Sequence, residues 1–318
     1  MASSTSIPRT RICRSKLLDR VAPPWWLVLV AAIAAPHDAT GANAGALAPN
    51  IAAESSPRSL TDSDNNSEGQ QAFAPRNVDD FVRGITLNPG FADNESLVRW
   101  NSPICLFALG FPPDDTKIVI ARLSQIIGAV GAPLATDRAC NPNFVIITTD
   151  EPNQVLAAWY ARNKQLFGDA SPLQIRHFLD SNTGKPILVW RNINLGRTST
   201  MRFGHFVPSD SQAESSPFTR NEVLSFFSIF AIVDTGRVAH VTRRALTDYL
   251  AMTGLSNVDL DVDVGPAPSI LRLFVVSDSR PVGLSRLDAA FLTALYHSDQ
   301  HSRTQRHDIA ERMLESLR

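Results

Sequence analysis

Short apolar runs alternate with longer stretches of periodic apolar positions from Val78 onward, and both kinds are bounded by Pro, Gly, Asn or Asp. Runs that are rich in β-branched and aromatic residues are typical of buried strands. These runs predict strands at residues 97–100, 104–109, 143–149, 187–193 and 223–233. The last run is the most apolar, and we expect it in the centre of the sheet.

Apolar positions that recur every three to four residues predict helices between these strands and after the last of them. The expected helices span residues 78–85, 113 to 128 or 131, 151–160, 172–179, 238–252, 286–297 and 303–317. Asn77 and Asp150 are the expected caps of the first and third helices, because a side-chain oxygen there can accept from a free helix amide.

The second helix should open at Pro113 and bury one continuous apolar stripe. We expect this stripe to contain Ile118, Ile120, Leu123, Ile126 and Ile127. Residues 206–218 are rich in Ser, Asp and Pro and predict a loop. Early alternation of strands and helices, followed by a helical end, predicts one α+β domain at residues 78–318, with a mixed sheet and a helical C-terminal part.

The N-terminal 44 residues have the pattern of an export signal. Five basic residues precede an apolar run at residues 25–35, and Ala42-Asn43-Ala44 forms a small-residue cleavage site. The run has about half of the roughly 20 residues that a membrane-spanning helix needs. We therefore expect cleavage and a periplasmic or secreted protein; the alternative is an inner-membrane anchor through residues 25–35.

Residues 45–77 are rich in Ser, Asn, Asp, Pro and Ala and contain few large apolar side chains, which predicts a disordered linker. Removal of residues 1–44 would take away five basic and two acidic side chains and leave a net charge near −4. The mature chain has no basic stripe of the kind that binds phosphates, so nucleic acid is not an expected partner.

Two cysteines, Cys105 and Cys140, remain in the mature chain. An even count in an exported protein predicts a disulfide, and two buried free thiols are the alternative. A bond that closes a loop of about 35 residues would contribute roughly 3 to 4 kcal/mol in the chain-entropy model. The chain has no CxxC pair and no Cys/His cluster, so no structural zinc site is expected.

The stretch Ala245 to Leu255, ALTDYLAMTGL, keeps the spacing of the zincin pattern HExxHxxG. With Gly254 on the final glycine, Thr247 and Ala251 take the positions of the two histidine ligands, and Asp248 takes that of the general base. A Pro-Ser-Ile-Leu segment follows at residues 268–271, and a helix opens at residues 285–288 and ends in Leu-Tyr.

In this order of segments the C-terminal part resembles zincin-like metallopeptidases, and the chain is similar to an uncharacterised family of bacterial exported proteins. The resemblance implies a zincin-like scaffold. A peptidase of that class uses both helical histidines to hold zinc, whereas a threonine hydroxyl and an alanine methyl are not zinc ligands. We therefore expect no cofactor and no metal.

Asp248 is the one weak catalytic candidate. The simpler interpretation is a solvent-facing ion pair with Arg243 or Arg244, which stabilises a fold by only about 0 to 1 kcal/mol. The alternative is a hydrolase in which Asp248 is the general base and His240 or His205 completes the site.

Three further histidines, His297, His301 and His307, lie close together in the sequence. A pair at i and i+4 could bind a metal only if the helix continued past residue 297, where Ser-Asp-Gln predicts a turn. We interpret them as surface residues, and His37, His177, His205 and His240 have no partner at ligand spacing.

No GxSxG, phosphate-loop or dinucleotide pattern occurs in the chain. The sequence therefore favours an exported, non-catalytic protein with a degenerate zincin-like domain that binds a cell-envelope component or a protein partner. The sequence predicts membrane association only if the N-terminal segment is not cleaved.

Overall fold

The computed structural model of the chain describes residues 75–87, 97–137, 139–194, 199–202, 205–208, 224–275 and 280–318. The predicted signal peptide, the possible anchor at residues 25–35 and the linker up to residue 74 lie outside these ranges. No helix in the described ranges has both the length and the apolar character needed to cross a membrane.

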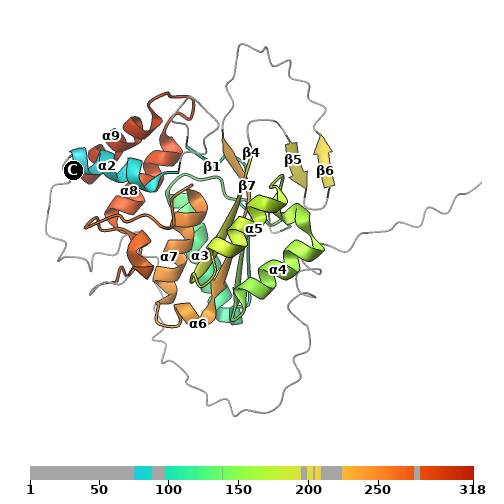
Figure 1. Cartoon of the computed structure of the whole chain (residues 1–318). Helices are drawn as coiled ribbons and strands as arrows, with labels where there is room; N and C mark the ends of the chain where they lie inside the picture. The colour runs from blue at the N-terminus through green and yellow to red at the C-terminus, as the bar shows by residue number, and fades with distance from the viewer. Residues whose placement is uncertain are drawn as a thin grey trace, which may run out of the picture. The chain divides into compact units, whose positions relative to one another are not determined.

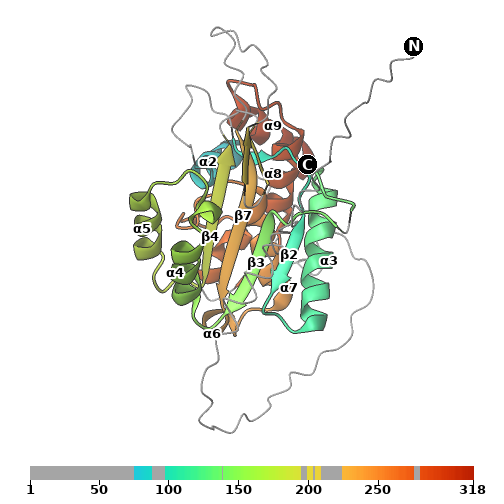
Figure 2. The same ribbon diagram turned by 90° about the vertical axis from the view of Figure 1, so that its right-hand side faces the viewer.

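The core of the fold is a five-stranded, largely parallel sheet (Figure 1). Its strands are β1 (Arg99–Trp100), β2 (Leu106–Leu109), β3 (Phe144–Thr149), β4 (Ile187–Asn194) and β7 (Ser225–Asp234). As predicted, β7 is central: β4 pairs with one of its edges in antiparallel orientation, and β1 and β3 pair with the other in parallel orientation. β2 lies beyond β3, so the strands fan out in the order β4, β7, β3, β2 (Figure 2).

Eight α-helices and two 3-10 helices lie within the described ranges. The α-helices are α2 (Pro75–Ile85), α3 (Pro113–Ala129), α4 (Pro152–Arg162), α5 (Pro172–Ser181), α6 (Thr235–Val238), α7 (Arg243–Leu255), α8 (Arg286–His297) and α9 (Gln305–Leu317). The 3-10 helices are η1 (Lys164–Phe167) and η2 (Ile270–Phe274). β5 (Ser199–Arg202) and β6 (His205–Pro208) pair in antiparallel orientation as a separate two-stranded sheet.

Helices cover both faces of the sheet. α3 and α7 pack side by side on one face, while α4 and α5 lie on the other (Figures 1 and 2). α2, α8 and α9 form a helical group that extends the first face. The helical C-terminal end and the mixed sheet agree with the prediction. The class differs from the predicted α+β: the domain is mixed α/β, because its helices cover both faces of a largely parallel sheet.

Each face of the sheet has its own apolar core, because successive strand residues point to opposite sides. Ile229, Ala231 and Val233 of β7 belong to the larger core under α3 and α7. Phe230 points the other way, and its ring lies 5.5 Å from that of Trp159 on α4. The sequence of a strand that is buried on both faces is a nearly continuous apolar run, which explains the composition of β7.

A β-bulge in β7 changes this alternation near the start of the strand. Asn192 of β4 pairs with Ser228 and the next residue, Ile193, pairs with Phe226, so Phe227 has no partner on β4. The extra residue brings Phe226 onto the same face as Ile229. Phe226 then packs against Trp100 of β1, with 5.8 Å between the ring centroids.

Several local predictions differ from the structure. α2 begins at Pro75, two residues before the predicted cap at Asn77, and β6 occupies the start of the predicted loop at residues 206–218, most of which lies outside the described ranges. In α3, Val119 is buried and Ile118 is 49% exposed, so the buried stripe is shifted by one residue at its start. Asp150 caps nothing, because α4 begins one residue later, after Glu151, with no side-chain cap.

Gly254 sets the distance between α7 and the sheet. A Cβ at this position would overlap the ring of Phe144 on β3, whose Cε1 atom would lie 2.5 Å away. Phe144 is fully buried, and its ring stacks on Trp100 with 6.4 Å between centroids. Neither ring has free space, so only glycine lets the helix lie this close to β3.

We therefore expect Gly254→Ala to lower the free energy of unfolding by about 1 to 3 kcal/mol, the usual cost of overpacking a dense core. The matched control is Gly128→Ala in α3, where a Cβ would meet no atom within 4 Å. That change should be neutral or slightly stabilising, because alanine favours a helix over glycine. Urea unfolding of both variants tests this, and equal stabilities would contradict the close packing of α7.

Candidate functional site

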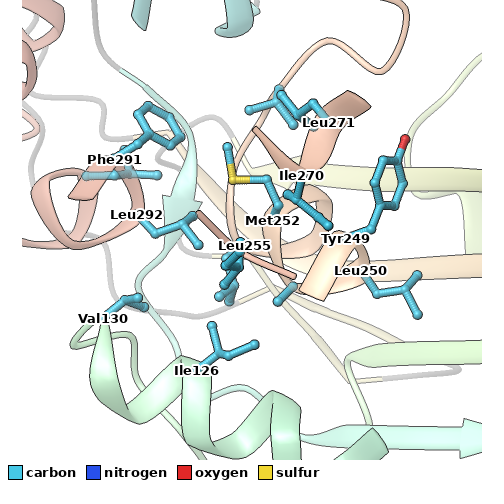
Figure 3. Close-up of a cluster of buried hydrophobic side chains, with 14 of the residues drawn as sticks. Ile126, Val130, Tyr249, Leu250, Met252, Leu255, Ile270, Leu271, Phe291 and Leu292 are labelled. Atoms are coloured by element: carbon cyan, nitrogen blue, oxygen red, sulfur yellow. The ribbon is translucent and has the colours of Figure 1, made fainter. Parts of the chain in front are cut away.

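The stretch in which we expected the zincin-like positions forms α7, and it lies inside the protein. Every residue from Ala245 to Leu255 is buried, and the exposed fractions of Thr247, Asp248 and Ala251 are 1%, 0% and 0%. Side chains from α3, η2 and α8 surround it, including Ile126, Ile270 and Phe291 (Figure 3). The candidate residues therefore lie under packed side chains and do not line a cleft.

Neither residue at the histidine-ligand positions has a free polar group. The hydroxyl of Thr247 donates a hydrogen bond of 2.7 Å to the carbonyl of Arg243, one turn earlier in the helix. Ala251 belongs to the large apolar core. This part of α7 offers neither the donor atoms nor the open coordination position that a catalytic zinc needs.

Asp248 forms an ion pair, but not the predicted one. We expected a solvent-facing pair with Arg243 or Arg244, whereas Asp248 is buried and pairs with Arg122 of α3. Its Oδ1 accepts from Arg122 Nε at 2.8 Å, and its Oδ2 accepts from Arg122 Nη2 at 2.9 Å. Arg243 instead pairs with Asp115, at 2.8 Å. The prediction was wrong because Asp248 points toward α3, a neighbour that helix periodicity alone does not identify.

The same carboxylate also holds the segment that leads into α8. Asp248 Oδ2 accepts a hydrogen bond of 2.9 Å from the amide of Leu284. A Cβ on the preceding residue, Gly283, would lie 2.7 Å from Asp248 Oδ2 and 3.1 Å from Arg244 Nε. Asp248 therefore joins three segments of the chain, and its two oxygens are occupied by protein donors rather than directed at a substrate.

The C-terminal end of α7 is also buried, which creates a hydrogen-bonding problem. The last four carbonyls of a helix have no partner within the helix, and burial without a donor costs free energy. In α7 the carbonyl of Met252 accepts from the hydroxyl of Ser256 at 2.6 Å. The carbonyl of Thr253 accepts from Arg191 of β4, through Nε at 3.1 Å and Nη2 at 3.0 Å. Desolvation lowers the pKa of Arg191 to about 10, so it stays charged at neutral pH.

Two aromatic side chains bind the remaining carbonyls. Trp100 of β1 donates from Nε1 to the carbonyl of Gly254 at 2.8 Å. Tyr296 of α8 donates from its hydroxyl to the carbonyl of Leu255, also at 2.8 Å. Each of the four terminal carbonyls thus has a side-chain donor, and these donors come from different parts of the fold.

Sequence reasoning did not identify Asp288 as a key residue, although its motif was visible. Ser285 and Asp288 form a capping box at the start of α8, the pattern that Ser followed three residues later by an acidic side chain indicates. Asp288 also accepts from the hydroxyl of Ser269 at 2.6 Å and from the amide of Ile270 at 2.8 Å. Burial raises the pKa of Asp288 to about 6, against the opposite effect of these hydrogen bonds.

The histidines do not form a metal site in the described part of the chain, where no group of three potential ligands occurs. α8 ends at His297, as the Ser-Asp-Gln turn predicted, so His297 and His301 do not share a helix face. His240 is exposed in the turn after α6. For His205 the structure describes only the backbone, and His37 lies outside the described ranges.

An open cavity of about 260 Å³ lies at the carboxyl ends of β3 and β7. It is lined by Asp150, Glu151, Pro152, Asn153, Gln154, Gly184, Lys185, Asp234 and Arg237. The carboxyl edge of parallel strands is the usual place for ligands in α/β folds. Arg237 pairs with Asp234 at 3.2 Å, and Lys185 with Asp261 at 2.7 Å, so the charged rim is partly neutralised within the protein.

Comparison with protein-family models, with curated proteins and with solved structures finds no match for this chain.

The buried ion pair gives a prediction for stability. Arg122→Ala would leave the carboxylate of Asp248 buried without its cation, and we expect a loss of about 3 to 5 kcal/mol in the free energy of unfolding. The control is Lys117→Ala on the same helix, because Lys117 and Asp114 form an exposed pair at 3.0 Å. That change should have almost no effect. Similar losses in urea unfolding for both variants would contradict a structural role for the Arg122–Asp248 pair.

The raised pKa of Asp288 predicts a pH dependence of stability. The carboxyl has a pKa of about 6 in the folded protein and an ordinary value of 3.8, so the folded state binds this proton more tightly. The contribution of the protonated Asp288 carboxyl to the free energy of unfolding should be fully present below about pH 4 and lost as the pH rises through about 6. The difference in unfolding free energy between wild type and Asp288→Asn, measured from pH 4 to 7, should follow this curve. A difference that does not change with pH would contradict the raised pKa.

Proposed function

We propose that this protein is exported and non-catalytic, and that it binds a protein partner or a cell-envelope component. In this proposal the segment from α7 to α8 is a degenerate zincin-like scaffold, similar to that of uncharacterised bacterial exported proteins, and α7 is a structural element. The observation that carries the proposal is the complete burial of Thr247, Asp248 and Ala251.

The hydrolase alternative is less well supported by the geometry. A general base must reach a water molecule that can attack the substrate. The oxygens of Asp248 are bound to Arg122 and to the amide of Leu284, and the side chain has no exposed surface. His240, one of the histidines that could complete such a site, lies exposed after α6. These contacts are those of a residue that stabilises a fold.

Two further observations support the rest of the proposal. The structure joins Cys105 to Cys140 by a disulfide, a bond that persists in oxidising compartments outside the cytoplasm. The cavity at the carboxyl ends of β3 and β7 offers a concave surface with charged side chains of both signs. Such a surface fits a polar group of a partner better than an apolar small molecule.

The test uses protein purified from the exported fraction, with intact mass to establish removal of the signal. After the protein has been dialysed against a zinc solution, we expect it to bind far less than one zinc ion per chain. We also expect no peptidase activity, because α7 supplies no zinc ligands. Asp248→Asn serves as the matched variant, since it removes the carboxylate charge and nearly preserves the side-chain volume. Stoichiometric zinc, together with a peptidase activity that Asp248→Asn abolishes while circular dichroism shows an intact fold, would overturn the proposal.

A further inference from the structure

The disulfide joins the residue before β2 to the connection between α3 and β3. The Cα atoms of Cys105 and Cys140 lie 5.9 Å apart, and the bond closes a sequence separation of 35 residues. We infer that this bond is a reducible clasp on the exposed part of the connection, residues 136, 137 and 139–142, and that its reduction leaves the sheet intact. This part is called the clasped segment below.

The chain before the clasped segment is fixed without the disulfide. Ile104 forms a parallel bridge with Leu134. Its amide donates to the carbonyl of Pro133 at 2.8 Å, and its carbonyl accepts from the amide of Ala135 at 2.9 Å. Ile104 is fully buried, so these hydrogen bonds are protected from water. Residues 133–135 would therefore stay in place after reduction.

The chain after the clasped segment is fixed by Asn143. Its Oδ1 accepts from the amide of Cys105 at 2.7 Å, and its Nδ2 donates to the carbonyl of Pro103 at 3.0 Å. The amides of Asn143 and Phe144 both donate to the carbonyl of Cys105 at 3.1 Å. From Phe144 onward β3 pairs with β2 and β7. The start of β3 is therefore held by hydrogen bonds that do not involve either sulfur atom.

Between these two anchors, the hydrogen bonds described for the clasped segment lie within it. Asp137 accepts from the amide of Ala139 through Oδ1 at 2.8 Å and from the amide of Cys140 through its carbonyl at 3.3 Å. Asp137, Ala139 and Asn141 are exposed. The disulfide is thus the one described link from this segment to the body of the domain, and the segment should open locally when the bond is broken.

The two cysteine residues differ in exposure. Cys105 is 5% exposed, while Cys140 is half-buried in the exposed connection. A thiolate of a dithiol reductant would attack Sγ of Cys140 and displace the thiolate of Cys105, which takes up a proton from water. The second thiol of the reductant then displaces Cys140. Two electrons and two protons reduce the protein disulfide to two thiols, and the reductant becomes a cyclic disulfide.

Hydrogen exchange under native conditions tests this proposal. After treatment with a dithiol reductant and alkylation of the two thiols, we expect faster amide exchange by about tenfold or more in the clasped segment alone. Exchange in β2, β3 and α3 should stay as slow as in the oxidised protein. The double variant Cys105→Ser/Cys140→Ser should fold and show the same pattern without reductant, although its global stability will be lower because its unfolded chain is less constrained.

Asn143→Ala is the matched variant, since it removes the anchor after the clasped segment but keeps the disulfide. Reduction of this variant should extend the faster exchange into β2 and the start of β3. The proposal would be overturned if the wild-type disulfide reacts only in denaturant, if reduction of the wild type speeds exchange throughout β2 and β3, if the double serine variant fails to fold, or if the exported protein contains two free thiols.

Discussion

The fold depends on satisfying the last four carbonyls of α7 in a place where water has no access. An isolated carbonyl in an apolar interior costs about 1 to 3 kcal/mol, so four of them would cost about 4 to 12 kcal/mol, which is comparable with the whole net stability of a domain. Ser256, Arg191, Trp100 and Tyr296 supply the missing donors. These donors belong to β1, β4, α8 and the residue after α7 itself, so the position of the helix depends on contacts with both the sheet and α8.

Two buried carboxylates extend this dependence to the C-terminal helices. Asp248 links α7 to α3 and to the amide of Leu284, and Asp288 links the start of α8 to Ser269 and Ile270. A buried carboxylate is tolerated only when its oxygens have donors, so each group fixes the relative positions of the segments that surround it. Asp248 and Asp288 therefore maintain the architecture around α7.

The sequence was sufficient for the features that depend on local patterns. The limits of α8, the central position of β7 and the turn after His297 follow from periodicity, composition and capping, all of which act over a few residues. It was insufficient where a distant neighbour decides the outcome. Asp248 looked like a surface residue because Arg122, which buries and neutralises it, is 126 positions away in the chain. Trp100 and Arg191 gave no signal as helix caps for the same reason, since helix capping is usually recognised within one segment.

The bulge at Phe227 has a consequence for how this chain can change in length. One extra residue in β7 lets Phe226 belong to the same core as Ile229 rather than to the opposite one. Deletion of Phe227 would remove the bulge and leave Phe226 paired with Ile193, on the same face as Ile229 and beside Trp100. The bulge therefore lets β7 carry one residue more than the strand opposite it while Phe226 keeps its place in the core, so a homologous chain without residue 227 should keep the same packing with a regular strand.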